Sequence, residues 1–150
     1  MFTPALDTYV NESSPTMNYG TAVTLRADAS PIMRSYLTFK VQGLSGTVTR
    51  VTLRVFTNSS SGTGYEVRGV ADTSWGEGTI NYSNAPAAGT VIGTSGSFGS
   101  GVWTTADVTP LITGNGTFSL ALTTINTTAF SLASREAGAS APQLVIETTP

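Results

Sequence analysis

The chain has 150 residues and few charges, since Asp, Glu, Lys and Arg make up 11% of it, against about 25% in ordinary soluble domains. A net charge of −2 and the lack of a basic block argue against nucleic acid as a partner. The chain contains no cysteine and no histidine, which excludes disulfides, thiol chemistry and triads built on histidine. The length suits one domain, and we predict a single domain over residues 1–150.

Thr, Ser, Asn and Gly supply most of the polar surface, in runs such as "TNSSSGTG" and "TTINTT". With a single lysine, this composition is what we expect of an extracellular bacterial domain. No apolar run reaches the length of about 18 residues that spans a membrane, so we expect no membrane partner. The N-terminal "MFTPALDTYV" lacks the basic and apolar regions of a signal peptide. The protein is therefore either cytoplasmic or one domain of a longer exported protein with neighbouring domains, and we favour the second.

Alternation of apolar and polar residues predicts strands along almost the whole chain. Turn residues separate them, as in "GLSG", "NSSSGTG" and "SNAPAAG". The only helical candidate is short and covers residues 104–114. Roughly nine or ten strands of this kind predict an all-β fold, a two-sheet antiparallel β-sandwich for which we favour a jelly roll. In chain order, the predicted strands are 22–28, 33–41, 49–57, 64–70, 90–94, 101–107, 116–124, 129–135 and 142–147.

The strand 33–41 presents a candidate ligand face. Alternation turns Leu37, Phe39 and Val41 toward the core and leaves Arg34, Tyr36 and Lys40 on the opposite face. There Tyr36 could stack on the flat face of a ligand while Arg34 and Lys40 meet acidic groups on it, and Arg26 could extend the patch from a neighbouring strand. The alternative is an ordinary solvated strand face.

Four segments, in this order and spacing, resemble a known family: "ALDTYVNESSPTMNYG", "RSYLTFKVQGLSGTVTRVTLRVF", "ADTSWGEGTINYSNAPAAG" and "FSLASREAGASAPQLVIE". Together they resemble the DNRLRE-type domain, which overlaps carbohydrate-binding module family 96, over essentially the whole chain. The resemblance implies a β-sandwich of exported proteins, found beside polysaccharide lyases and hydrolases, and a link to alginate, an acidic polysaccharide. The counterparts of the residues in the family label are Asp7, Asn18, Arg34, Leu37, Arg135 and Glu136.

Arg135 and Glu136 are adjacent charges at the end of the predicted strand 129–135 in a chain that is poor in charge. In one interpretation, Arg135 presents its planar fork to a sugar carboxylate or to vicinal hydroxyls, and Glu136 orients it. In the other, the two residues form an ion pair that secures the edge of the sandwich. Both interpretations are open at this point.

Aromatic and amide residues in the loops are further candidates for sugar contacts. Tyr19 and Tyr82 offer flat rings for the apolar faces of sugars, and Asn81 and Asn84 offer donors and acceptors for hydroxyls. For Trp75 and Trp103 we favour the alternative, in which each ring caps the core of the sandwich.

Calcium is the metal that the chain could bind, because Ca²⁺ takes carboxylate, amide and carbonyl oxygens. No ligand spacing of a known loop occurs, and the candidates are Asp7, Asp28 and Asp107, with Asn11 as an amide ligand. Asp107 could instead cap the helical turn that follows it. We expect at most one structural Ca²⁺ and no other cofactor.

No catalytic motif is present, and the nine acidic residues form no recognisable glycosidase pair. We therefore predict a protein that is not an enzyme but a carbohydrate-binding module. It would bind a polysaccharide, acidic if Arg34, Lys40 and Arg135 form the site, and target an attached catalytic or surface protein to it. The alternative is a structural or adhesive sandwich of a surface protein or fibre without a sugar site.

Overall fold

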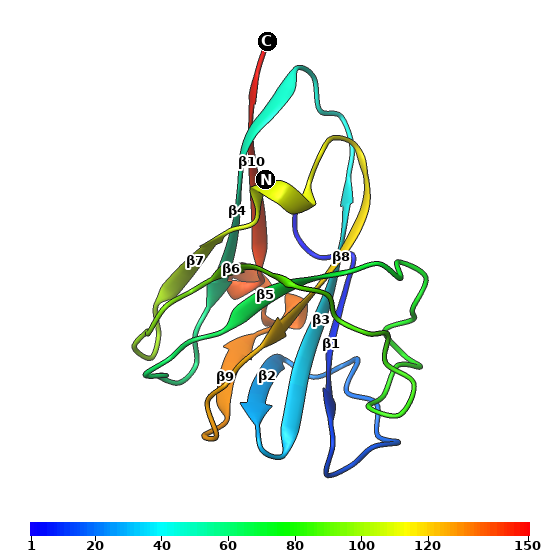
Figure 1. Cartoon of the computed structure of the whole chain (residues 1–150), viewed down its shortest axis with the longest axis vertical. Coiled ribbons are helices and arrows are strands. Elements are labelled where there is room, and N and C mark those ends of the chain that lie inside the picture. The colour runs from blue at the N-terminus through cyan, green and yellow to red at the C-terminus, as the bar shows by residue number, and fades with distance from the viewer.

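The computed structural model describes all 150 residues and folds into two antiparallel β-sheets that pack face to face (Figure 1). The larger sheet has seven strands in the order β6-β5-β8-β3-β2-β9, with β1 also paired to β3, and the smaller has the order β10-β4-β7. The predicted all-β sandwich is thus confirmed, whereas the jelly-roll arrangement stays a prediction. The elements are β1 (Leu6–Asn11), β2 (Thr24–Ala29), β3 (Ile32–Val41), β4 (Thr47–Phe56), β5 (Glu66–Val70), β6 (Val91–Thr94), β7 (Trp103–Asp107), the 3₁₀ helix η1 (Thr109–Leu111), β8 (Gly116–Thr123), β9 (Phe130–Ala133), the 3₁₀ helix η2 (Arg135–Ser140) and β10 (Gln143–Thr149).

Each of the nine predicted strands has a counterpart in the structure, and β1 is the additional strand. Four consecutive residues of β1, from Asp7 to Val10, are buried, so this strand shows no alternation of inward and outward positions. The helical candidate at 104–114 is largely wrong, because β7 occupies residues up to Asp107 and only Thr109–Leu111 form a helical turn.

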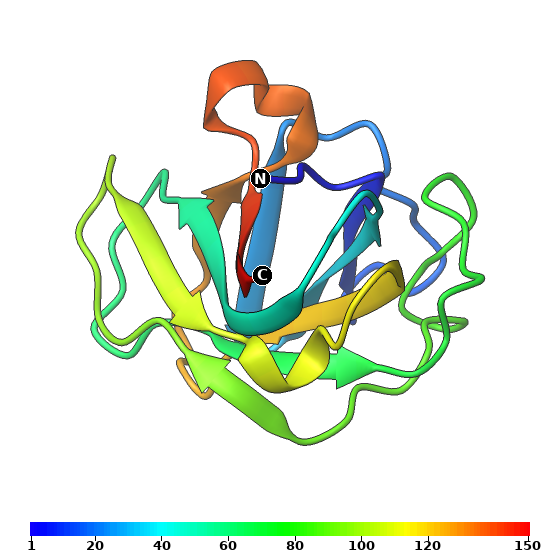
Figure 2. The ribbon, with the colours of Figure 1, turned by 90° about the horizontal axis from the view of Figure 1, so that it is seen from above.

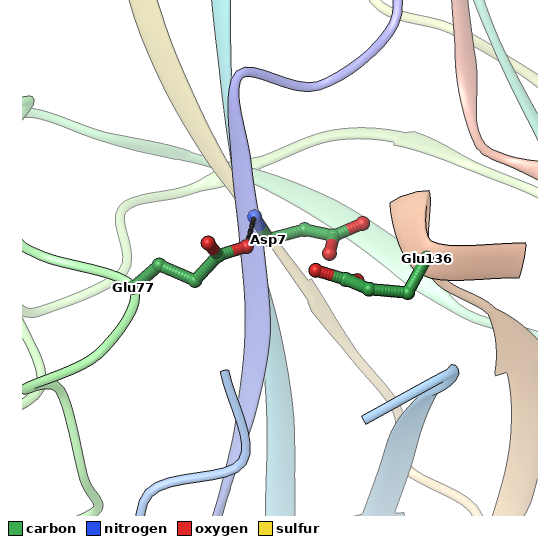
Figure 3. Close-up of side chains that lie close together, drawn as sticks. All are labelled: Asp7, Glu77 and Glu136. Carbon is green, nitrogen blue, oxygen red and sulfur yellow. Dashed lines mark hydrogen bonds between the residues drawn. The ribbon is translucent and has the colours of Figure 1, made fainter. Parts of the chain in front are cut away.

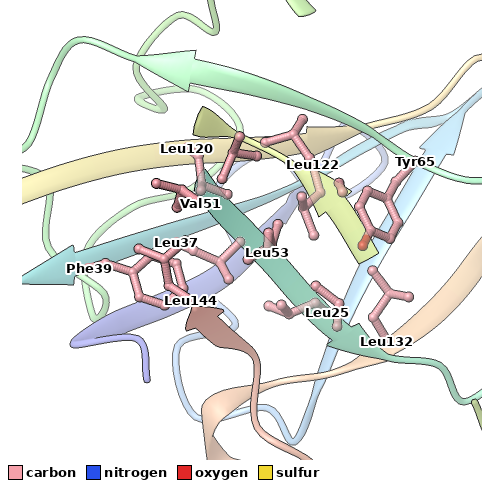
Figure 4. Close-up of a cluster of buried hydrophobic side chains, with 14 of the residues drawn as sticks. Leu25, Leu37, Phe39, Val51, Leu53, Tyr65, Leu120, Leu122, Leu132 and Leu144 are labelled. Atoms are coloured by element: carbon pink, nitrogen blue, oxygen red, sulfur yellow. The ribbon is translucent and has the colours of Figure 1, made fainter. Parts of the chain in front are cut away.

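The main core lies between the two sheets and consists of alternate residues from facing strands. Leu37 and Phe39 of β3 and Leu120 of β8 meet Val51 and Leu53 of β4, all without exposed surface (Figure 4). These are the inward positions that alternation predicted. On β4 the intervening Arg50, Thr52, Arg54 and Phe56 are partly or fully exposed on the outer face of the small sheet.

A second, smaller core lies on the opposite face of the large sheet. The long connection between β5 and β6, residues 71–90, lies on the side of the molecule away from β7 in both views (Figures 1 and 2). Its Trp75 and Ile80 pack on Tyr36 of β3 and Ala121 of β8. Residues 71–90 thus cover the face that sequence alternation alone would leave to solvent.

This second core corrects the predicted ligand face of strand 33–41. Tyr36 has 0% exposure, its ring meets Trp75 edge to face at 6.0 Å, and its hydroxyl donates to the carbonyl of Pro86. It cannot stack on a sugar. Lys40 is exposed but lies six residues along the strand from Arg34, which is about 20 Å of extended chain.

The two tryptophans take different positions. Trp75 is buried in the second core, as predicted, and its indole nitrogen donates to Ser119 Oγ. For Trp103 the prediction of core capping is wrong: the ring is half-buried beside Phe56 and lies 4.5 Å from the guanidinium carbon of Arg54. It belongs to the outer face of the small sheet.

Trp75→Ala should lower the free energy of unfolding by about 3–5 kcal/mol, because it empties the centre of the second core. The matched variant Trp103→Ala loses one aromatic pair and one cation contact and should cost about 0.5–1.5 kcal/mol. Urea denaturation of both variants measures the difference. A loss for Trp75→Ala as small as the one expected for Trp103→Ala would contradict a stabilising role of residues 71–90.

Candidate functional site

Arg135 stands at the meeting point of three segments that are distant in sequence. β9 ends at Ala133 and η2 begins at Arg135, so the predicted strand stops two residues early. The turn follows from Ser134, whose side chain accepts the backbone N–H of Glu136 at the start of η2. Arg135 therefore leaves the sheet and reaches residues 71–90 and β1.

The guanidinium of Arg135 is bound by Glu77 through both arms of its fork. Arg135 Nε donates to Glu77 Oε1 at 2.6 Å, and Nη2 donates to Oε2 at 2.5 Å. Glu136 Oε1 lies 3.4 Å from Nε, and the backbone N–H of Arg135 donates to Asp7 Oδ2 at 2.8 Å. We term Asp7, Glu77, Arg135 and Glu136 the Arg135 node, whose three carboxylates are drawn in Figure 3.

Residues 71–90 are also tied to the segment between β1 and β2. Asn18 Nδ2 donates to the carbonyls of Glu77 and Ile80 at 2.7 and 2.8 Å. A Cβ on Gly20 would lie 2.3 Å from the carbonyl oxygen of Glu77, so only glycine permits this approach. Glu77 is thereby held from both its side chain and its backbone.

The node shifts the pKa values of its members in opposite directions. Burial, reinforced by the charges of Glu136 and Glu77, raises the pKa of Asp7 to about 7 against the opposing N–H of Arg135. Burial also acts to raise the pKa of Glu77, but hydrogen bonds from Arg135 and from the backbone of Asp7 outweigh it and lower the pKa. Arg135 has its pKa raised chiefly by its hydrogen bonds to Glu77. These contacts support the ion-pair interpretation of Arg135 and Glu136 over the ligand interpretation.

Arg135→Ala should destabilise the protein by about 1–3 kcal/mol, between the values for exposed and buried pairs, because it leaves Glu77 and Glu136 without their cation. Arg50→Ala, which removes an exposed arginine from β4, is the matched control and should change stability by less than about 0.5 kcal/mol. Denaturant titration at neutral pH compares the two. A neutral effect of Arg135→Ala would contradict the structural role.

Stability should also depend on the ionisation of Asp7. The folded state holds the Asp7 proton up to pH about 7, whereas the unfolded chain releases it near the ordinary value of 3.8. The contribution of Asp7 is therefore fully present below pH about 4 and lost as pH rises toward 7. In EDTA, the wild type should lose stability relative to Asp7→Asn over this range, as measured by urea unfolding. Parallel pH profiles would contradict the shifted pKa.

A pocket of about 350 Å³ opens where the ends of several strands of the large sheet meet Ala88 of the connection 71–90. Its charged lining comprises Arg34 of β3, Glu66 and Arg68 of β5, and Asp28 of β2. Thr123 and Thr124 add hydroxyls, and Ile32, Met33 and Ile125 add apolar surface. We term this the Arg34 pocket.

The two arginines of the pocket differ in how many hydrogen bonds and ion pairs they already form within the protein. Arg68 donates to Thr123 Oγ1 and to the carbonyl of Gly89, both at 3.0 Å, and lies 3.6 Å from Glu66. Arg34 has no carboxylate within 4.0 Å, and its Nε is buried without a hydrogen-bond partner. Its guanidinium carbon lies 5.3 Å from the centre of the Tyr82 ring. Arg34 is thus an uncompensated cation beside a cavity.

The other predicted contact residues do not join this pocket. Arg26 is exposed on β2, where its pairing partner is Ser131 of β9, and Tyr19 stacks on Tyr9 at 4.2 Å. Asn81 and Asn84 accept each other's backbone N–H groups at 3.0 and 2.7 Å, so their side-chain oxygens build a turn. The predicted set Arg34, Tyr36 and Lys40 is not one site.

The predicted metal ligands lie apart from one another. Asp107 Oδ1 accepts the N–H and the hydroxyl of Thr109 in a local turn before η1, whereas the N-cap of η1 is Val108, without a side-chain hydrogen bond. Asp28 Oδ1 accepts the N–H of Ser30 and Asn11 Oδ1 that of Ser13. Only Asp7 belongs to a group of acids, with Glu77 and Glu136.

Arg68, Glu66 and Glu77 are the functional candidates that the sequence analysis missed. For the first two a signal existed, because alternation in the strand 64–70 places Glu66 and Arg68 on the face opposite the buried Tyr65 and Val67. Glu77 lies in a connection without periodicity, and nothing in the sequence pairs it with Arg135.

The protein is an antiparallel β-sandwich with a pocket of the size of a small ligand at the surface of its larger sheet. The model of carbohydrate-binding module family 96 matches residues 1–148, and the chain belongs to this family. This confirms the resemblance found in the sequence and makes the protein a carbohydrate-binding module. No curated protein matches the sequence, and none of the helices is long and apolar enough to cross a membrane.

Four of the residues that carried the resemblance gather at one place. Asp7, Arg135 and Glu136 form the node with Glu77, and Asn18 binds the backbone of Glu77. Leu37 is in the main core. Of these six residues, only Arg34 lines a pocket. The other five have structural roles, whereas Arg34 is a candidate for ligand binding.

Proposed function

We propose that this carbohydrate-binding module is not an enzyme and that it binds an acidic polysaccharide of the alginate type through the Arg34 pocket. The observation that carries the proposal is the state of Arg34, a guanidinium beside a cavity with no ion-pair partner and one buried, unpaired N–H. A sugar carboxylate in the pocket would neutralise the charge of this guanidinium.

The size and lining of the pocket suit sugar units. A volume of about 350 Å³ lies in the range of about 300–1,000 Å³ that is common for small-ligand sites. Glu66, Asp28 and Thr123 line it with acceptors that sugar hydroxyls could use. Tyr82 lies beside Arg34 and offers a ring for an apolar sugar face.

The acidic groups of the pocket restrict where a sugar carboxylate would bind. Glu66 already lies 3.6 Å from Arg68, so the charge of Arg68 is largely satisfied. A carboxylate would therefore bind at the Arg34 side, with hydroxyls toward Glu66 and Asp28. This asymmetry favours a glycan with both a carboxylate and free hydroxyls over a densely charged one.

We also propose that the module is one domain of a larger exported protein. We propose that the module acts outside the cell, as its composition of Thr, Ser, Asn and Gly suggests. By binding the glycan it would raise the local concentration of an attached catalytic or surface domain at its substrate.

Arg34→Ala should weaken binding to alginate about 10- to 100-fold, the loss that follows from removing a charge-assisted hydrogen bond. Arg50→Ala makes the same change of charge on β4 of the other sheet and should leave affinity within about twofold, so it controls for the general field of the protein. Arg34→Lys keeps the charge without the planar fork and should be intermediate. Calorimetry or affinity electrophoresis against alginate, pectin, xylan and a neutral glucan gives the affinities, with melting temperatures to confirm folding.

Binding of an acidic glycan by the wild type should weaken as salt rises. Equal losses in Arg34→Ala and Arg50→Ala would place the site elsewhere. If no glycan binds and the protein self-associates, the structural or adhesive role replaces the proposed one. Release of reducing ends or unsaturated sugars from any of these glycans would contradict the absence of catalysis.

A further inference from the structure

We propose that the Arg135 node binds one Ca²⁺ ion between the carboxylates of Asp7, Glu77 and Glu136. The proposal concerns a different part of the molecule from the Arg34 pocket and does not rest on the proposed glycan. Asp7 alone among the metal candidates of the sequence takes part, and its two companions come from the residues 71–90 and from η2.

The first argument is a buried oxygen without a partner. Asp7 is 1% exposed, and its Oδ2 accepts the N–H of Arg135 while Oδ1 has no hydrogen-bond partner. Polar atoms buried in this way are rare because losing water without a replacement is costly. In Figure 3 the Asp7 carboxylate points toward that of Glu136. A cation between them would satisfy Oδ1.

The second argument is distance. One carboxylate oxygen from each of Asp7, Glu77 and Glu136 lies within 4.8 Å of the others. Ca²⁺ binds oxygens at about 2.3–2.6 Å, so two ligands on opposite sides of the ion are about 4.6–5.2 Å apart and neighbouring ligands are closer. Mg²⁺, with ligands at about 2.0–2.1 Å, needs a tighter arrangement. The three oxygens are thus close enough to share one Ca²⁺ ion.

The third argument is charge. Three carboxylates and one guanidinium carry a net charge of −2 when all are ionised, which one divalent cation would neutralise. Arg135 directs its hydrogen bonds to Glu77, and its Nε is 3.4 Å from Glu136 Oε1. The charge of Glu136 is thus only weakly compensated within the protein, and the carboxyl of Asp7 accepts only the backbone N–H of Arg135.

The ion would also have an open side for water ligands. The side chain of Glu136 is 24% exposed and that of Glu77 15% exposed, whereas Asp7 closes the inner side. Since Ca²⁺ takes six to eight oxygens, water would complete its shell from the solvent side. The bound ion would join β1, residues 71–90 and η2 at the point where Arg135 already joins them.

Calcium titration of EDTA-treated protein, followed by calorimetry and by thermal unfolding, tests the site with the metal alone. The wild type should bind one Ca²⁺ and melt at a higher temperature as Ca²⁺ is added, and Mg²⁺ should bind at least about tenfold more weakly. Glu136→Gln and Asp7→Asn should each weaken Ca²⁺ binding at least tenfold. Glu147→Gln, which changes an exposed acid of β10, is the matched control and should bind as the wild type does.

Asp7→Asn should fold in EDTA, because it removes a charge that burial disfavours. Loss of Ca²⁺ binding in this variant can then be ascribed to the missing ligand and not to unfolding. Absence of binding heat and of a melting shift in the wild type would overturn the proposal. Unchanged binding in both Asp7→Asn and Glu136→Gln would also overturn it, since the ion would then lie elsewhere. Because no glycan is present, neither result bears on the Arg34 pocket.

Discussion

The fork of Arg135 on Glu77 is the contact on which the rest of this structure depends. Residues 71–90 form a long connection without helix or strand, and such segments stay in place only where specific contacts hold them. The ion pair fixes its first half, and Asn18 and Gly20 hold the same point through the backbone. Further along, the hydroxyl of Tyr36 holds Pro86. The connection can then cover the sheet with Trp75 and Ile80.

Because residues 71–90 cover the middle of the large sheet, the residues beneath them on its outer face are buried and cannot contact a ligand. Tyr36, Thr38 and Ser119 would face water on a bare antiparallel sheet, but here they are buried. Their polar atoms are paired within the second core, with Thr38 bound to Ser119 and Ser119 to Trp75. A flat sugar-binding platform over the middle of β3 is therefore not available. The pocket lies instead at one end of the strand, where Ala88 of the covering connection contributes to its lining.

The arginines of the chain differ in whether their guanidinium groups already have hydrogen-bond and ion-pair partners. Arg135 is bound within the node, and Arg68 is held by Thr123, Gly89 and Glu66. Arg34 keeps an unpaired, buried N–H beside a cavity. In a protein with so little charge, the difference between these arginines is the main physical argument for the proposed site at Arg34. The same division separates the acids, since Glu77 is paired while Asp7 keeps an oxygen without a partner.

The sequence by itself determined the sandwich, its strands and the inward positions such as Leu37, Leu53 and Leu120, because side-chain alternation is a local property of the extended chain. Its segments also indicated the family. It could not show that Tyr36 is buried or that Arg34 and Lys40 are separate, since alternation distinguishes two faces of a strand but not what covers them. The pairing of Arg135 with Glu77, 58 residues apart, and the meeting of Arg34 with Glu66 and Arg68 in one pocket were decided by tertiary structure alone. Both depend on strand order and on the path of residues 71–90, which are set by long-range packing rather than by local sequence.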